Sequence, residues 1–163
     1  MALPALIFPA ENRAPKPRRL VSNDIPWMID LSRRRFGSGW DQISAEGWFT
    51  GEVLTKHALY LPIRTSNAFL IALLNAMPWS LTRMEAIVLL LVTDDDAVWE
   101  GVQLLRTSVE WAKVRGAAHW RYWWDEGDAY ILARRVGAKM DTPRYRIDLY
   151  DERSQQQPWQ PGR

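Results

Sequence analysis

The amino-acid sequence predicts an α/β (α+β) chain: a single domain with a mixed β-sheet, helices on both faces and an extended arm at each end. Three observations predict this class. The 163 residues are 47 % hydrophobic and 25 % charged, the balance of a domain that buries one core. Between residues 21 and 150, helical periodicity alternates with short apolar runs. Residues 1–20 and 151–163 are rich in proline and polar residues, which predicts extended arms.

The first half of the domain is predicted to contain two helices and a β-hairpin. Four prolines exclude a helix from residues 1–20, whereas apolar side chains from Ile25 to Phe36 share one helical face. A second helix is predicted over residues 41–54. Residues 58–63 and 68–74 are predicted strands, because the Arg-Thr-Ser-Asn segment between them is typical of a turn.

The second half is predicted to alternate strands and helices. Residues 86–92 form a continuous apolar run, which indicates a central strand covered on both faces. A long helix should follow, capped by Thr93, with Asp96 as its capping-box partner and Gly116 at its end. Its apolar residues from Val98 to Ala112 follow a 3-4 spacing. A strand over 117–124, a short helix over 126–136 and a strand over 144–150 complete the domain.

Composition excludes several chemistries. The chain has no cysteine, so disulfide scaffolds, cysteine nucleophiles and cysteine-ligated metals are excluded, and two histidines leave little scope for a histidine-based metal site. A net charge of +2 does not indicate nucleic acid, and no apolar run is long enough for a membrane span. The ten tryptophans are unusual, because large aromatic side chains are favoured where surface is buried against a partner.

The predicted order of elements resembles the GNAT (Gcn5-related N-acetyltransferase) fold, and three segments carry the resemblance. Leu104-Leu105-Arg106 and the segment 110–117 look like the family's long central helix running into the next strand. The segment 132–138 looks like its short helix and following turn. The resemblance covers residues 20–150. The segments Ile25-Pro26 and 33–36 look like GNAT-like proteins encoded by tailed phages, which implies a virion protein as one kind of partner.

The resemblance implies an acetyl-CoA site, but the family's pyrophosphate loop is poorly matched. That loop reads Gln/Arg-x-x-Gly-x-Gly/Ala before the Leu-Leu pair, and here Asp96 and Trp99 take its first two defining positions. Only Gly101 matches. At an effective dielectric of 20, a carboxylate about 4 Å from a bound phosphate would weaken phosphate binding by about 4 kcal/mol through charge repulsion. We therefore expect no cofactor and a degenerate acyltransferase.

The family's catalytic tyrosine is not matched either, because its position falls on Ala133. Under the alternative hypothesis of an active acetyl-CoA-dependent N-acetyltransferase, Tyr130 would be the general acid and Glu85 the base. The cofactor-binding residues would then be Val92, Trp99, Gly101 and Val102.

The leading hypothesis is a protein-interaction and assembly module whose arms wrap a neighbour, which is either a second copy or a virion protein. The expected partner-binding residues are apolar side chains of both arms and of the strand predicted over 117–124: Leu3, Leu6, Ile7, Phe8, Trp123 and Trp159. A third hypothesis is a weak nucleic-acid-binding module formed by the basic arm and the tryptophan-rich strand. The expected location is the cytoplasm of a host cell or the virion, with no membrane partner.

Overall fold

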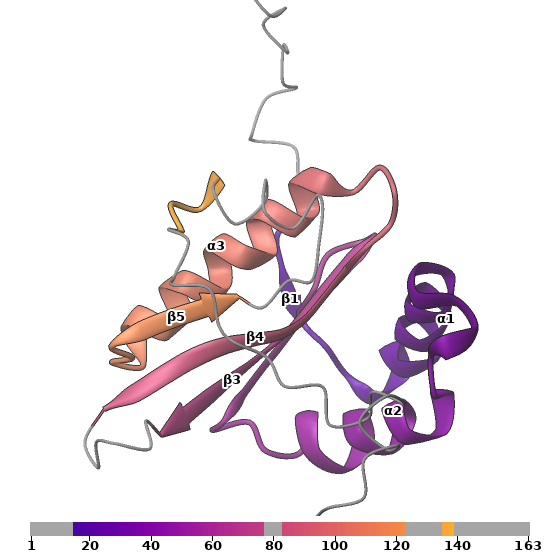
Figure 1. Cartoon of the computed structure of the whole chain (residues 1–163), viewed down its shortest axis with the longest axis horizontal. Coiled ribbons are helices and arrows are strands. Elements are labelled where there is room, and N and C mark those ends of the chain that lie inside the picture. Colours follow the sequence, from indigo (N-terminus) through magenta and orange to yellow (C-terminus); the bar gives the residue numbers. More distant parts are fainter. Residues whose placement is uncertain (1–14, 77–82, 123–134, 139–163) are drawn as a thin grey trace, which may run out of the picture.

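A computed structural model describes residues 15–76, 83–122 and 135–138 of the chain (Figure 1). The first half contains β1 (Arg18–Arg19), the 3-10 turn η2 (Ser22–Asp24), α1 (Ile25–Phe36), the 3-10 turn η3 (Gly37–Gly39), α2 (Gln42–Trp48) and the π-helical turn η4 (Phe49–Val53). The second half contains β2 (Tyr60–Arg64), β3 (Ala68–Ala76), β4 (Met84–Thr93), α3 (Val98–Val114) and β5 (His119–Tyr122).

The five strands form one mixed sheet in the order β1-β2-β3-β4-β5. The pairs from β1 to β4 are antiparallel, and β4 pairs with β5 in parallel, so the predicted mixed sheet is confirmed. The β3–β4 register shifts where Ile71 faces Leu90 and Ala72 faces Val88, which makes Leu89 the extra residue of a β-bulge. The sheet begins at Arg18, inside the segment assigned to the N-terminal arm.

Helices cover both faces of the sheet, as the sequence predicts. In Figure 1, α1 and α2 lie on one side of the strands and α3 on the other. Met28 and Phe49 are buried against Phe69 on the first face. Val102 and Leu105 are among the α3 residues buried on the opposite face.

The start of α3 differs from the prediction. Thr93 is the last residue of β4 and pairs with Ala68, so it does not cap the helix. Ala97 occupies the N-cap position, and no side chain caps the helix there. Hydrogen-bonded pairing between β3 and β4 continues along the apolar run as far as Thr93. Because Thr93 is paired in the sheet, it does not act as the helix cap that the local sequence predicts. The other end of α3 is as predicted, with Gly116 following at φ +71°.

Two predicted elements lie outside the described residues: the strand over 144–150 and nearly all of the helix over 126–136, of which Arg135 and Val136 are described. The strand predicted over 117–124 is observed as β5, and its last two residues also lie outside. None of the helices in the described ranges combines the length and the apolar character that a bilayer crossing requires.

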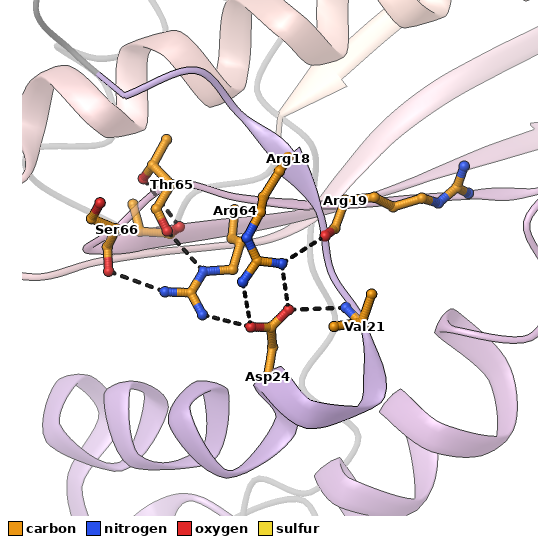
Figure 2. A network of polar contacts seen from close by, with 8 residues as sticks. Arg18, Arg19, Val21, Asp24, Arg64, Thr65 and Ser66 are labelled. Carbon is orange, nitrogen blue, oxygen red and sulfur yellow. Dashed lines mark hydrogen bonds and ion pairs between the residues drawn. The ribbon is translucent and has the colours of Figure 1, made fainter.

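A polar network fixes β1 to the start of α1 (Figure 2). The Asp24 carboxylate accepts hydrogen bonds from Arg18 at 2.6 and 2.8 Å, from the Val21 amide at 2.9 Å and from Arg64 at 2.7 Å. The Arg64 guanidinium also lies 3.5 Å from the centroid of the Trp27 ring. The bonds from Arg18, with those from Val21 and Arg64, lower the pKa of Asp24 to about 2 although burial opposes them.

Candidate functional site

The candidate site lies where β4 ends and α3 begins. The last described pair of β4 with β5 is Val88 with Tyr122, and the bulge at Leu89 follows directly on β4. Leu89 is 40 % exposed. Among the described residues, no strand lies beside β4 on this edge beyond Val88.

The first turn of α3 carries a carboxylate that is held in place by the β2–β3 turn. Glu100 accepts hydrogen bonds from the backbone and side-chain nitrogens of Asn67 at 2.8 and 2.9 Å. Burial raises the pKa of Glu100, but hydrogen bonds from Thr65, Asn67 and Ser66 outweigh it and hold the pKa below its usual value. These donors are uncharged, so Glu100 keeps its negative charge, and it lies at the positive end of the helix dipole.

Three further carboxylates lie on the connection between β4 and α3. Arg34 at the end of α1 donates to both oxygens of Asp94 at 3.2 Å and forms an ion pair with Asp30 at 3.3 Å. Asp95 and Asp96 are exposed and form no ion pair with the described residues. The charge around the start of α3 is therefore predominantly negative. No three His, Cys, Asp or Glu side chains come together as possible metal ligands in the described parts of the chain.

The comparisons with known proteins find similarity in structure alone. No family profile and no curated protein matches the sequence. An acetyltransferase of Trypanosoma brucei is 12 % identical at a TM-score of 0.65, with 82 % of this chain and 99 % of that chain covered. An aminoglycoside acetyltransferase from an uncultured soil metagenomic sample, in complex with sisomicin, is 17 % identical at a TM-score of 0.63, with 86 % and 99 % covered.

The chain has a GNAT-like fold. A transcriptional regulator from Bacillus halodurans C-125 is also similar, at 16 % identity and a TM-score of 0.67, with 83 % of this chain and 99 % of that chain covered. Proteins with different described roles thus share this architecture. The fold alone does not assign an activity, which has to be argued from the site.

The residues predicted to hold acetyl-CoA lie at the end of β4 and in the first turns of α3. Val92 and Val102 are fully buried in the two cores. Gly101 lies inside the first turn of α3, and its N–H donates to Ala97 at 3.0 Å. Trp99 packs against the core under α3, and the Arg135 guanidinium lies 5.1 Å from its ring centroid. The Gly101 N–H is therefore already bonded within the helix, and Trp99 places an indole ring at the start of α3.

The predicted base lies away from the bulge of β4. Glu85 is buried near the start of the strand, 3.2 Å from Arg121. At about 3.3 Å per residue, it lies about 13 Å along the strand from Leu89. The structure therefore does not bring Glu85 to the bulge. Tyr130, the predicted acid, lies outside the described residues.

The described side chains of β5 lie on two faces of the sheet. Trp120 and Tyr122 pack on the α3 side, and the Trp120 Nε1 donates to buried Ser108 at 2.9 Å. Arg121 is on the other face, with Glu85. The predicted partner-binding residues all lie outside the described residues: Leu3, Leu6, Ile7, Phe8, Trp123 and Trp159.

Sequence alone did not predict the β-bulge at Leu89 or the hydrogen bonds between Glu100 and Asn67. A bulge needs one extra residue in one strand, and an apolar run gives no sign of which residue is extra. Glu100 is bound by residues of a turn 33 positions earlier, so only the fold brings them together.

Proposed function

We propose that this GNAT-like chain is a protein-assembly module that does not use the start of α3 to bind acetyl-CoA. The observation that carries the proposal is the ionised Glu100, held by neutral donors in the first turn of α3 beside exposed Asp95 and Asp96. A phosphate brought to this helix end would meet several like charges. The protein's own carboxylates already compensate the helix dipole there.

The sequence composition supports protein association as the alternative use of the fold. The N-terminal arm contains Leu3, Leu6, Ile7 and Phe8 within its first eight positions. Extended segments of this kind bury much surface per residue when they order on a partner. A virion protein as the partner remains an expectation from the resemblance to phage-encoded proteins.

An acetyl-CoA-dependent N-acetyltransferase is the second candidate. It is favoured by the β-bulge at Leu89, near the β4–α3 connection, where strand amides and carbonyls could hold an extended ligand. It is also favoured by the acetyltransferases among the structurally similar proteins. On this hypothesis the ligand would depend on the strand for affinity, because the helix end disfavours its phosphates.

Calorimetric titration of the purified full chain with acetyl-CoA and with CoA separates the two candidates. The proposal expects no detectable binding at millimolar ligand. A Kd below about 100 µM, equivalent to about −5.5 kcal/mol, would overturn it and favour the acetyltransferase. Amine acceptors and the Tyr130→Phe variant would then be examined.

Light scattering after size exclusion tests the assembly half of the proposal. Deletion of residues 1–14 leaves β1 and the Asp24 network in place. We expect the full chain to self-associate or to retain a protein partner, and the deleted chain to remain folded without doing so. Equal association of the two proteins, with equal melting temperatures, would contradict a role for the N-terminal arm.

A further inference from the structure

Two arginine side chains that are far apart in the sequence meet at the turn leading into β2. Arg19 of β1 donates to the carbonyl oxygens of His57 and Tyr60, each at 3.4 Å. Arg115, which follows the end of α3, donates to the carbonyl oxygen of Ala58. The backbone of one short segment therefore holds both guanidinium groups in place.

Neither arginine has a carboxylate partner in the parts of the chain that the structure describes. Carboxylates near this turn along the chain are already paired: Glu52 with Lys56 at 2.6 Å, and Glu110 with Lys113 at 2.8 Å. Both arginines are exposed. The fold thus holds two like charges near one another without a counter-charge, an arrangement that an anionic partner would stabilise.

Aliphatic side chains are exposed beside the two arginines. Leu59 follows Ala58 and is 41 % exposed, and Val114 precedes Arg115 and is 85 % exposed. The four side chains of Arg19, Leu59, Val114 and Arg115 form the basic surface. It contains no aromatic ring on which a nucleic-acid base could stack, so an acidic protein surface with aliphatic groups fits it better than a nucleic acid does.

The start of α3 carries the complementary surface. Asp95 and Asp96 are exposed, and Val98 is 45 % exposed. These three side chains form the acidic surface, which opposes two carboxylates and one aliphatic group to the two guanidiniums and two aliphatic groups of the basic surface. Because α3 has 17 residues, its ends are about 25 Å apart, and the two surfaces cannot meet within one chain (Figure 1).

We infer that the basic surface of one copy binds the acidic surface of a second copy. This inference rests on the proposed assembly function and names its partner and its site. Each guanidinium has five N–H donors and keeps some of them beyond its bonds to the turn, so it can donate to Asp95 or Asp96. Packing of Val98 against Leu59 and Val114 would exclude water around these ion pairs.

The contact joins unlike surfaces, so a copy that uses one of them still presents the other. Repetition of the contact gives a ring or a chain of copies, whereas reciprocal use within one pair gives a two-fold dimer. A contact of this size is weak by itself, and the N-terminal arm of the proposed function adds the rest of the affinity.

Charge reversal in the full chain tests the inference. Arg19→Glu/Arg115→Glu makes both surfaces acidic, and Asp95→Lys/Asp96→Lys makes both surfaces basic. We expect each variant alone to self-associate at least about tenfold more weakly than the unmodified chain in sedimentation velocity, because like charges then face each other. An equimolar mixture of the two should regain association, because every surface again meets its opposite charge. Failure of the mixture to regain it would overturn the inference.

Arg33→Glu/Arg35→Glu is the matched control, because it reverses two exposed arginines near the end of α1 and changes the net charge equally. It should associate as the unmodified chain does, and equal weakening would mean that net charge governs association. Arg19→Lys/Arg115→Lys keeps the charge and should retain association. Melting curves establish that each variant is folded, and recovery in the mixture gives a second demonstration.

The outcome is separable from the proposed function. Undiminished association of both reversal variants, with loss of association on deletion of residues 1–14, would reject these surfaces and leave arm-dependent assembly standing. A full chain that stays monomeric but retains a different protein would reject the second copy as the partner and leave the assembly role. A monomeric full chain that binds acetyl-CoA would reject both.

Discussion

Replacing Asp24 with asparagine should destabilise the chain at neutral pH by removing the one carboxylate that joins β1, α1 and β2. Asp24 is 6 % exposed and accepts from Arg18, Val21 and Arg64. Asparagine has nearly the same shape but no negative charge. The side chain of Arg64, which is 14 % exposed, would then lose its ionic partner.

The magnitude follows from the pKa of Asp24. Its folded pKa of about 2 lies below the ordinary aspartate pKa of 3.8. The difference corresponds to about 2 kcal/mol in favour of the folded state with ionised Asp24. Because the folded pKa is lowered, this contribution is present above about pH 5 and is lost as the pH falls through 4 toward 2. For a chain of this size, about 2 kcal/mol lowers the melting temperature by about 6 °C.

Urea unfolding followed by tryptophan fluorescence at pH 7, 4 and 2.5 measures this effect. We expect Asp24→Asn to lose about 2 kcal/mol at pH 7, with the deficit shrinking as the pH falls. Asp95→Asn is the matched control: Asp95 is exposed, so its loss should change stability by less than about 0.5 kcal/mol. Equal stability of Asp24→Asn and the unmodified chain at pH 7 would refute the reasoning.

Three further predictions concern the α3 side of the sheet. Trp120→Phe removes the hydrogen bond to Ser108 and should cost about 1 kcal/mol in urea unfolding. Burial raises the pKa of Tyr122 to about 12, so absorbance titration should show one tyrosine ionising last, and Tyr122→Phe should remove it. The stability that neutral Tyr122 contributes is present below pH 10 and is lost as the pH rises toward 12. Gly116→Ala should destabilise by about 1 kcal/mol in urea unfolding, because alanine is strained at φ +71°.

Local patterns predicted the elements of the fold well, because each depends on neighbouring residues. The turn between β2 and β3, the apolar run of β4 and the glycine at the end of α3 all act within a few positions. The capping prediction for Thr93 failed because pairing with Ala68 is a tertiary interaction. Local capping signals do not report how far a neighbouring strand extends.

The candidate site was less predictable, because its features depend on residues far apart in the chain. The mismatch at Asp96 and Trp99 is visible in the sequence, but the core packing of Trp99 is not. Asp24 and Arg64 are 40 positions apart, and Asn67 and Glu100 are 33 apart. Such pairs carry no local signal in a single sequence.

Stepwise removal of the carboxylates Asp95, Asp96 and Glu100 tests whether negative charge at the start of α3 prevents CoA binding. We expect Asp95→Asn/Asp96→Arg to bind CoA poorly, because Glu100 remains ionised in the first turn. Adding Glu100→Gln keeps an acceptor for Asn67 and removes the charge. A like charge at about 8 Å, with an effective dielectric of 20, costs about 2 kcal/mol, so this step should strengthen binding about 30-fold.

Glu110→Gln supplies the control for that step, because Glu110 lies toward the other end of the same helix and pairs with exposed Lys113 at 2.8 Å. Added to the same double variant, it changes the net charge equally but should leave CoA affinity unaltered. Calorimetry measures the affinities, and melting curves establish that Asn67 still holds the turn. Equal gains from both substitutions would mean that net charge governs binding. No gain in CoA affinity from Glu100→Gln would mean that the Trp99 ring sterically excludes the phosphates from this helix end, whatever its charge.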